Sequence, residues 1–175
     1  ITGAKITDIC AELNTLVEGR AMDDDGAVML KFDNGAKGVL MASQVAAGEE
    51  NALKIRVYGE KGGIEWLQHD PNTLIVKWLD EPTQILRAGS NYAHLSSFAT
   101  HNCRTPGGHP EGYLEAFANI YRNFALTLGC KLDGTEPTPE MLDFPSIEDG
   151  LRGMAFIDSV VASANSDKKW SPYIL

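Results

Sequence analysis

The chain has 175 residues, the length of one ordinary domain. Hydrophobic residues make up 43% of it and charged residues 22%, which is typical of globular proteins and excludes a disordered or fibrous chain. Its 15 Lys and Arg residues and 24 Asp and Glu residues give a formal net charge of −9, which argues against nucleic-acid and anionic-membrane partners. No run of about 18 apolar residues is available to cross a membrane.

Cysteine usage indicates a reducing compartment. Cys10, Cys103 and Cys130 are odd in number, widely spaced and without a C-x-x-C pair. A disulfide framework or a cysteine-rich zinc site would have a different pattern. We therefore expect reduced thiols and a cytoplasmic location.

Alternating apolar residues predict strands throughout the first half of the chain. Residues 28–33 alternate between apolar and other side chains, and Asn34-Gly35, which follows at once, is typical of a tight hairpin turn. The alternation continues on a return strand at 39–45. Further strands are expected at 4–17, 53–58, 64–69, 73–79 and 83–87. Strands this close in sequence pair antiparallel, because parallel pairing needs long crossovers.

The second half is expected to contain a polar loop, residues 88–109, and two helices. The first helix begins near Pro110 and ends at Gly129. Its apolar residues, spaced three and four apart on one face, are Leu114, Phe117, Tyr121, Phe124 and Leu128. The second helix has Ser146 as N-cap and Asp149 in the capping box. Its predicted buried stripe consists of Ile147, Leu151, Met154 and Val161.

These elements predict an α+β fold, an open, mostly antiparallel sheet of six or more strands with helices packed on one face. Apolar residues are also expected on the face opposite the core; they are Met29, Leu40, Tyr58 and Leu67. A sheet with two apolar faces is usually covered by a partner. We therefore expect a homo-oligomer formed through the open face.

The polar loop holds His94, His101 and His109, with Cys103 among them. Their spacing matches no compact zinc motif, so no metal site is expected, although a metal-dependent hydrolase remains open as an alternative. His109 precedes a helix amino terminus, where it could donate a hydrogen bond to a substrate hydroxyl or carboxylate. The other interpretation is a solvent-facing loop. For Glu111 and Glu115 we favour a structural role, in which the solvated carboxylates complement the helix dipole, over a role in a site.

Four separated blocks carry a family resemblance. In chain order they are 43–48 (SQVAAG), 57–66 (VYGEKGGIEW), 107–124 (GGHPEGYLEAFANIYRNF) and 149–152 (DGLR). With these blocks in this order, residues 6–172 resemble the carboxy-terminal domain of the Gfo/Idh/MocA oxidoreductases, the relatives of glucose–fructose oxidoreductase and inositol 2-dehydrogenase.

The resemblance implies that residues 1–175 form a single carboxy-terminal substrate-binding and oligomerisation domain. An amino-terminal Rossmann domain binding NAD or NADP would precede it in the full-length parent, a dehydrogenase acting on a sugar, inositol or related polyol. The family's glycine-rich cofactor loop and its Glu-Lys-Pro segment with the catalytic lysine have no counterpart here. Because these elements precede this domain in the family, the resemblance implies that the chain starts just downstream of them.

No catalytic, cofactor-binding or metal-binding residue is therefore expected in this chain. The substrate-binding candidates are His109, with Arg104 and Gln44 as weaker ones. For the chain alone we expect no catalysis, no NAD binding and a dimer or larger oligomer. The alternative is a stand-alone, non-catalytic binding or scaffold domain with the same fold.

Overall fold

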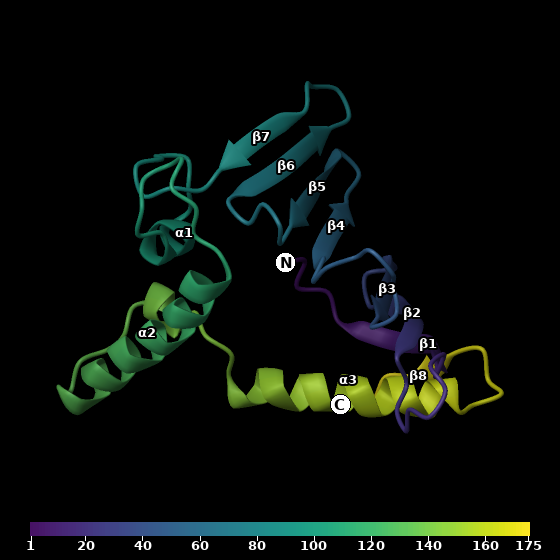
Figure 1. The fold of residues 1–175 in the computed structure, drawn as a ribbon. Coiled ribbons are helices and arrows are strands. Elements are labelled where there is room, and N and C mark those ends of the chain that lie inside the picture. The colour runs from purple at the N-terminus through teal and green to yellow at the C-terminus, as the bar shows by residue number, and fades with distance from the viewer. The chain divides into compact units, whose positions relative to one another are not determined.

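The computed structural model describes all 175 residues, which divide into two compact units (Figure 1). Unit 1 comprises residues 1–48 and 146–175, and unit 2 comprises residues 49–145. No helix of either unit is long and apolar enough to span a bilayer.

Unit 1 contains a four-stranded antiparallel sheet in the order β3-β2-β1-β8. Its strands are β1 (Ile6–Asn14), β2 (Asp25–Phe32), β3 (Lys37–Ser43) and β8 (Ser171–Pro172). The β2–β3 hairpin turns at the expected Asn34-Gly35 pair, where Gly35 has a φ of 83°. That left-handed conformation is accessible to glycine at no steric cost, so the turn prediction is confirmed.

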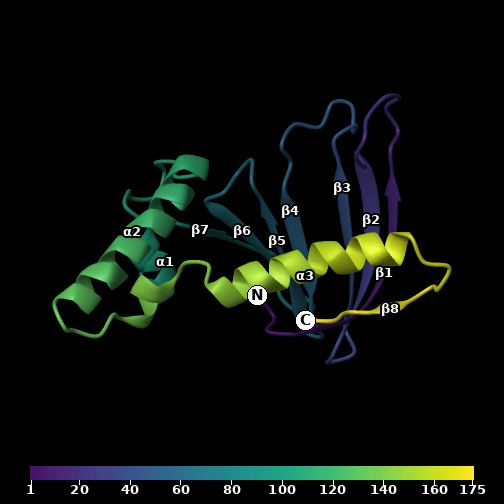
Figure 2. The ribbon, with the colours of Figure 1, turned by 90° about the horizontal axis from the view of Figure 1, so that it is seen from below.

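The helix of unit 1, α3 (Ile147–Ala164), begins where the sequence predicts. The Ser146 hydroxyl accepts a hydrogen bond from the Asp149 amide, and the Asp149 carboxylate accepts from the Ser146 amide, which completes the capping box. Figure 2 shows α3 lying across the strands of its sheet. There Val160 packs with Ile9 and Val28 in the buried core of the unit.

The face of α3 that is buried differs from the prediction. Val160 and Ser163 are buried, whereas the expected stripe of Ile147, Leu151, Met154 and Val161 is exposed. Successive helical residues lie about 100° apart around the axis, so a shift of one position selects another face. This helix has apolar residues on both faces, and periodicity therefore could not distinguish them.

The register of β3 corrects a second assignment. Leu40 lies opposite the buried Val28 and so shares its face of the sheet, rather than lying on the outer face as expected. The outer face instead carries Met29, Val39 and Met41, all exposed. Side chains alternate between the two faces of a strand, so an error of one residue in the predicted alternation assigns a residue to the wrong face.

Unit 2 contains a second four-stranded antiparallel sheet in the order β4-β5-β6-β7. Its strands are β4 (Lys54–Tyr58), β5 (Gly62–Leu67), β6 (Thr73–Trp78) and β7 (Gln84–Arg87). The predicted strands and their antiparallel pairing are confirmed. The predicted single sheet of six or more strands is not: the eight strands are hydrogen-bonded as two sheets of four, because no ladder joins β3 to β4.

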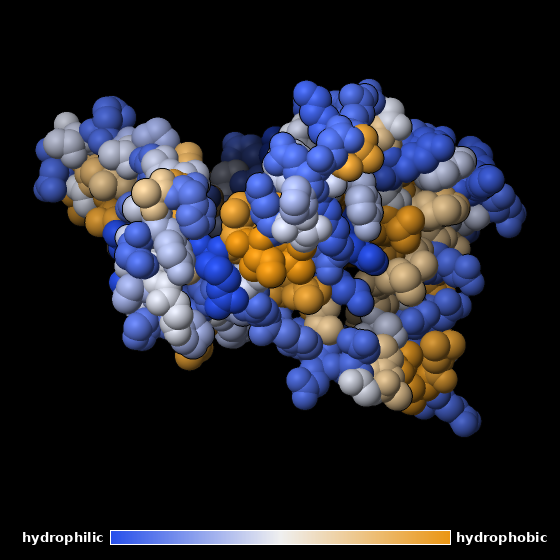
Figure 3. Space-filling model, turned by 90° about the horizontal axis from the view of Figure 1, so that it is seen from above, coloured by the Kyte–Doolittle hydropathy of each residue, from blue (hydrophilic) through white to orange (hydrophobic).

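The helical part of unit 2 comprises α1 (Ser97–Asn102), α2 (Tyr113–Leu132) and the 3₁₀ helix η1 (Pro139–Leu142). The predicted helix thus begins three residues after Pro110 and ends three residues after Gly129. Helix α2 packs mainly against η1 rather than on a sheet. The predicted packing of helices on a sheet is therefore found for α3, which contacts β1, and not for α2. The apolar face of α2 stays exposed, with Leu114 at 75% and Tyr121 at 71%. Hydrophobic patches of this kind are visible in orange on the face drawn in Figure 3.

Candidate functional site

A pocket of about 350 Å³ lies within unit 2, at the amino terminus of α2. Trp66 of β5 and Asn72 of the following turn form one side of it. The residues after α1 and the first two turns of α2 form the remainder. The pocket therefore lies where the long polar loop meets the helix.

Glu111 organises the loop beside this pocket. Its carboxylate accepts hydrogen bonds from the backbone amides of Arg104 (3.0 Å) and Thr105 (3.2 Å). Its own amide donates to Asn72 Oδ1 at 3.0 Å. Hydrogen bonds from amides to a charged carboxylate are strong. Glu111 thus ties the loop to the β5–β6 turn, a role beyond the dipole complement expected from sequence.

Glu115 caps α2. Its Oε2 accepts a hydrogen bond from the Gly112 amide at 2.8 Å. This bond, helped by the charge of Arg104, holds the pKa of the Glu115 carboxyl below its ordinary value of 4.5. Glu115 is therefore ionised at neutral pH and places a negative charge at the pocket wall.

The thiol of Cys103 also borders the pocket. Burial, followed by the negative charge of Glu111, raises the pKa of this thiol above its ordinary value of 9.0. A thiol with a raised pKa stays protonated at neutral pH and is a weak nucleophile. No group of three or more His, Cys, Asp or Glu side chains is arranged to hold a metal ion.

A network of asparagines holds the pocket's helices together. Asn123 is fully buried, and its Nδ2 donates to Asn102 Oδ1 (3.1 Å) and to the Asp143 carbonyl (3.2 Å). The Asn119 Nδ2 donates to the Asn102 carbonyl at 2.9 Å, and His101 Nε2 lies 2.9 Å from Asn123 Oδ1. The network joins α1, α2 and the segment after η1.

Sequence reasoning missed these asparagines. Asn119 and Asn123 are four residues apart within one predicted helix, so they share a face. This spacing was the signal that the sequence offered. Two amides on one helix face indicate a hydrogen-bonded network, because buried amides are normally hydrogen-bonded. Asn119 Oδ1 is a buried side-chain atom that has none.

Two of the three predicted substrate-binding residues lie on the loop beside the pocket. His109 is exposed, with Nδ1 3.3 Å from the Pro106 carbonyl, and its own carbonyl accepts from Thr105 Oγ1 at 3.1 Å. Arg104 is also exposed, with its backbone held by Glu111. Neither side chain lines the pocket, although both belong to the loop that Glu111 shapes.

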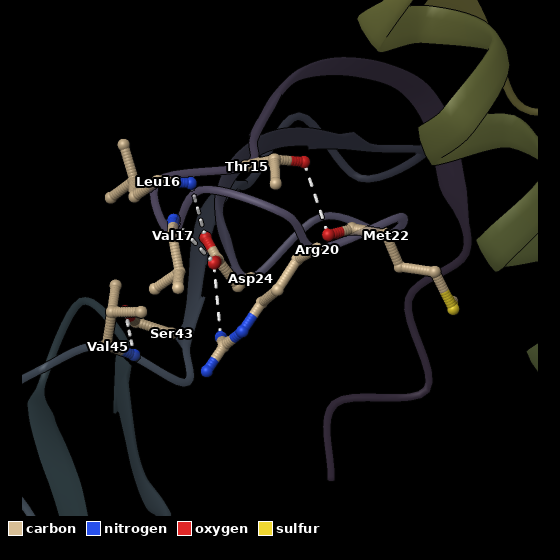
Figure 4. Close-up of polar contacts among 8 residues, drawn as sticks. All are labelled: Thr15, Leu16, Val17, Arg20, Met22, Asp24, Ser43 and Val45. Carbon is tan, nitrogen blue, oxygen red and sulfur yellow. Dashed lines mark hydrogen bonds and ion pairs between the residues drawn. The ribbon is translucent and has the colours of Figure 1, made fainter.

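The third candidate, Gln44, belongs to unit 1. It is exposed, and its backbone amide donates to the Asp24 carbonyl at 2.8 Å. Figure 4 shows the carboxylate of the same Asp24 accepting from the Leu16 amide (2.8 Å), the Val17 amide (3.1 Å) and the Arg20 guanidinium (3.1 Å). Gln44 thus follows β3, and its backbone is bonded to a firmly hydrogen-bonded turn that precedes β2.

Comparisons with known proteins bear on this arrangement. Residues 1–65 match the model of the GFO/IDH/MocA C-terminal domain. The chain is 34% identical over 167 residues to the uncharacterized oxidoreductase YfiI of Bacillus subtilis, covering 95% of this chain and 42% of that protein.

Solved structures agree. An oxidoreductase from Sinorhizobium meliloti is 42% identical with a TM-score of 0.88, over 97% of this chain and 47% of that one. An inositol dehydrogenase homolog from Azotobacter vinelandii, complexed with NADH and myo-inositol, is 29% identical with a TM-score of 0.87, over 98% of this chain and 45% of that one. The chain thus spans about half the length of these relatives. The resemblance found in the sequence motifs is confirmed: the chain belongs to the Gfo/Idh/MocA oxidoreductases, in the region of their carboxy-terminal domain.

Proposed function

We propose that residues 1–175 act as the substrate-binding and oligomerisation domain of an NAD- or NADP-dependent oxidoreductase acting on a sugar, inositol or related polyol. The observation that carries this proposal is the match of 98% of the chain, at a TM-score of 0.87, to a protein complexed with NADH and myo-inositol. Reduced thiols at all three cysteines are in keeping with the cytoplasmic location we propose.

The nicotinamide cofactor, which would accept or supply the hydride, does not fit against Gly107 or Gly62, one glycine from each of the two glycine-rich loops. A Cβ at Gly107 would clash with Tyr92 Oη, and one at Gly62 would clash with the Lys77 carbonyl. These glycines allow close packing against the protein's own atoms, so they form no open cradle for a pyrophosphate. We therefore assign cofactor binding and hydride transfer to the remainder of the parent.

This chain's own part is to bind and orient the polyol. In the proposal, His109 donates a hydrogen bond to a substrate hydroxyl, and the Arg104 guanidinium and Gln44 amide supply weaker contacts. Polar groups that bind hydroxyls discriminate strongly, because a ligand lacking the hydroxyl leaves them unpaired. Glu111 acts through His109 and Arg104 by holding the backbone of the loop to which both belong.

The test is turnover by the full-length protein with NAD or NADP and a panel of sugars and inositols. We expect reduction of the cofactor with at least one polyol, and a fall in kcat/KM of about tenfold or more in His109→Ala from the lost hydrogen bond. His69→Ala, which removes an exposed histidine outside the loop, is the matched control. Normal turnover in His109→Ala removes His109 from the site, and polyol binding without any turnover favours the scaffold alternative.

The proposed oligomer uses the open face of the sheet. On the outer face of unit 1, Met29 lies opposite Val39, and Met41 is two residues further along the same strand. These side chains are 42%, 72% and 81% exposed. Exposed apolar side chains on a sheet favour association with another copy. Analytical ultracentrifugation at micromolar concentration is expected to give a dimer or larger species, and a monomer contradicts this part of the proposal.

A further inference from the structure

We propose that the pocket at the amino terminus of α2 binds a small hydroxylated ligand that is neutral or positively charged, and that it disfavours anionic ones. This inference rests on the proposed function and narrows its substrate class to uncharged or amine-bearing polyols rather than sugar acids, at a subsite that His109, Arg104 and Gln44 do not line. It is carried by the pocket's size, its charge, its aromatic wall and an unmet acceptor.

The size suits a single sugar-like ring. The pocket volume of about 350 Å³ is at the small end of the range of about 300–1,000 Å³ found for small-molecule sites. All of its lining residues belong to unit 2, so unit 2 alone defines its chemistry.

The charge of the lining is negative. Glu111 and Glu115 both border the pocket, and no Lys, Arg or His does. Arg104 acts on Glu115 through its charge but lies outside the lining. Both carboxylates accept backbone hydrogen bonds already, yet each offers about four lone-pair sites and can accept further donors. A hydroxyl or ammonium is favoured beside them, and a second carboxylate is repelled.

Aromatic side chains provide the apolar side of the pocket. The rings of Tyr113 and Phe117 lie 4.8 Å apart at one wall. Trp66 is held in place by its Nε1, which donates to the Pro71 carbonyl at 2.9 Å. Aromatic faces pack against the C–H surface of a ring and attract cations. This wall therefore accommodates a neutral polyol or an amine and offers no positive charge to an anion.

Asn119 adds an unmet acceptor. Its Oδ1 has no hydrogen-bond partner although Asn119 lines the pocket. A buried acceptor without a donor is unfavourable, so a ligand that supplies one gains affinity. This oxygen is covered by protein, so the proposal requires the Asn119 amide to turn toward the pocket before a ligand hydroxyl can donate to it.

The experiment is calorimetric titration of the full-length protein with myo-inositol and with three ligands that share one ring: glucose, glucosamine and glucuronate. We expect measurable binding of at least one neutral or amine-bearing member, and glucuronate to bind at least about tenfold more weakly than the better of glucose and glucosamine. Glucuronate binding as tightly as these, or binding by no member, overturns the inference.

A variant pair locates the effect. Glu115→Gln removes one pocket charge and keeps an oxygen for the cap. We therefore expect the ratio of the Kd of glucuronate to that of glucose, here called the affinity gap, to narrow by about threefold or more. Glu136→Gln removes an exposed charge of unit 2 that lies outside the lining, and should leave the affinity gap unchanged. An equal shift in both variants assigns the selectivity to net charge and contradicts the pocket.

The two proposals fail separately. Turnover of sugar acids and neutral polyols alike leaves the oxidoreductase function standing and removes the charge selectivity. Selective polyol binding with no cofactor-dependent turnover leaves the pocket standing and removes the enzyme.

Discussion

The two units of this chain are stabilised in different ways. In unit 1, Ile9, Val28 and Val160 form a buried apolar core between a sheet and α3. Unit 2 has one buried large apolar side chain, Val76 at 8% exposure, and its most deeply buried residue is Asn123, which is fully buried. Its helices are joined by hydrogen bonds among asparagines and carbonyls.

This difference bears on where the candidate site lies. An apolar core is non-directional and tolerates rearrangement, whereas a buried polar network requires each partner in its place. The pocket and the loop of His109 and Arg104 lie in the unit that is held by directional bonds. We infer that the polar network positions the site, while the core of unit 1 supplies stability.

The largest effect is expected in unit 1. Ile9→Ala removes a fully buried side chain and should lower the free energy of unfolding by about 2–5 kcal/mol through lost burial and a residual cavity. Chemical denaturation measures it, with the exposed Ile85→Ala as control. Equal losses in both variants would contradict the assignment of the core.

A smaller effect is expected in unit 2. Asn123→Ala leaves the Asn102 Oδ1 and the Asp143 carbonyl without their donor and should cost about 1–3 kcal/mol. Hydrogen exchange should accelerate in α1 and α2, and change little in α3. The exposed Asn51→Ala is the control. If its cost equals that of Asn123→Ala, the network does not stabilise the unit.

The smallest effect is a pH dependence in the turn beside Gln44. The hydrogen bond from the Leu16 amide, followed by contributions from Val17 and Arg20, holds the pKa of Asp24 below its ordinary value of 3.8 against the opposing effect of burial. A carboxyl with a lowered folded-state pKa stabilises the protein above its unfolded pKa, and this stability is lost as the pH falls from about 4 through the lowered value.

Asp24→Asn should therefore lower the Tm at pH 7 and flatten its fall between neutral pH and about pH 3. Asp23→Asn, at the exposed neighbouring position, controls for the charge itself. The Tm of each variant is measured across this range. Parallel curves for Asp24→Asn and the unmodified protein would remove Asp24 as a source of acid sensitivity.

Local features of the fold could be predicted from sequence because their causes are local. The Asn34-Gly35 turn and the Ser146–Asp149 capping box each depend on residues within four positions of one another. The exposed face of α3 and the position of Leu40 could not be predicted, since each depends on which of two apolar faces meets the other element. The hydrogen bonds from Asn123 to Asn102 and Asp143 join residues about twenty positions apart, beyond the reach of periodicity.

The same distinction applies to the site. Sequence alone determined the family, through short motifs, and the loop on which His109 and Arg104 lie. The clamp made by Glu111, the charge of Glu115 at the pocket wall and the enclosure beside Trp66 were decided by tertiary structure. The physical reason is that neighbouring residues supply the hydrogen bonds of a turn or a cap. A pocket instead forms where segments distant in the chain come into contact, and local sequence patterns do not predict such contacts.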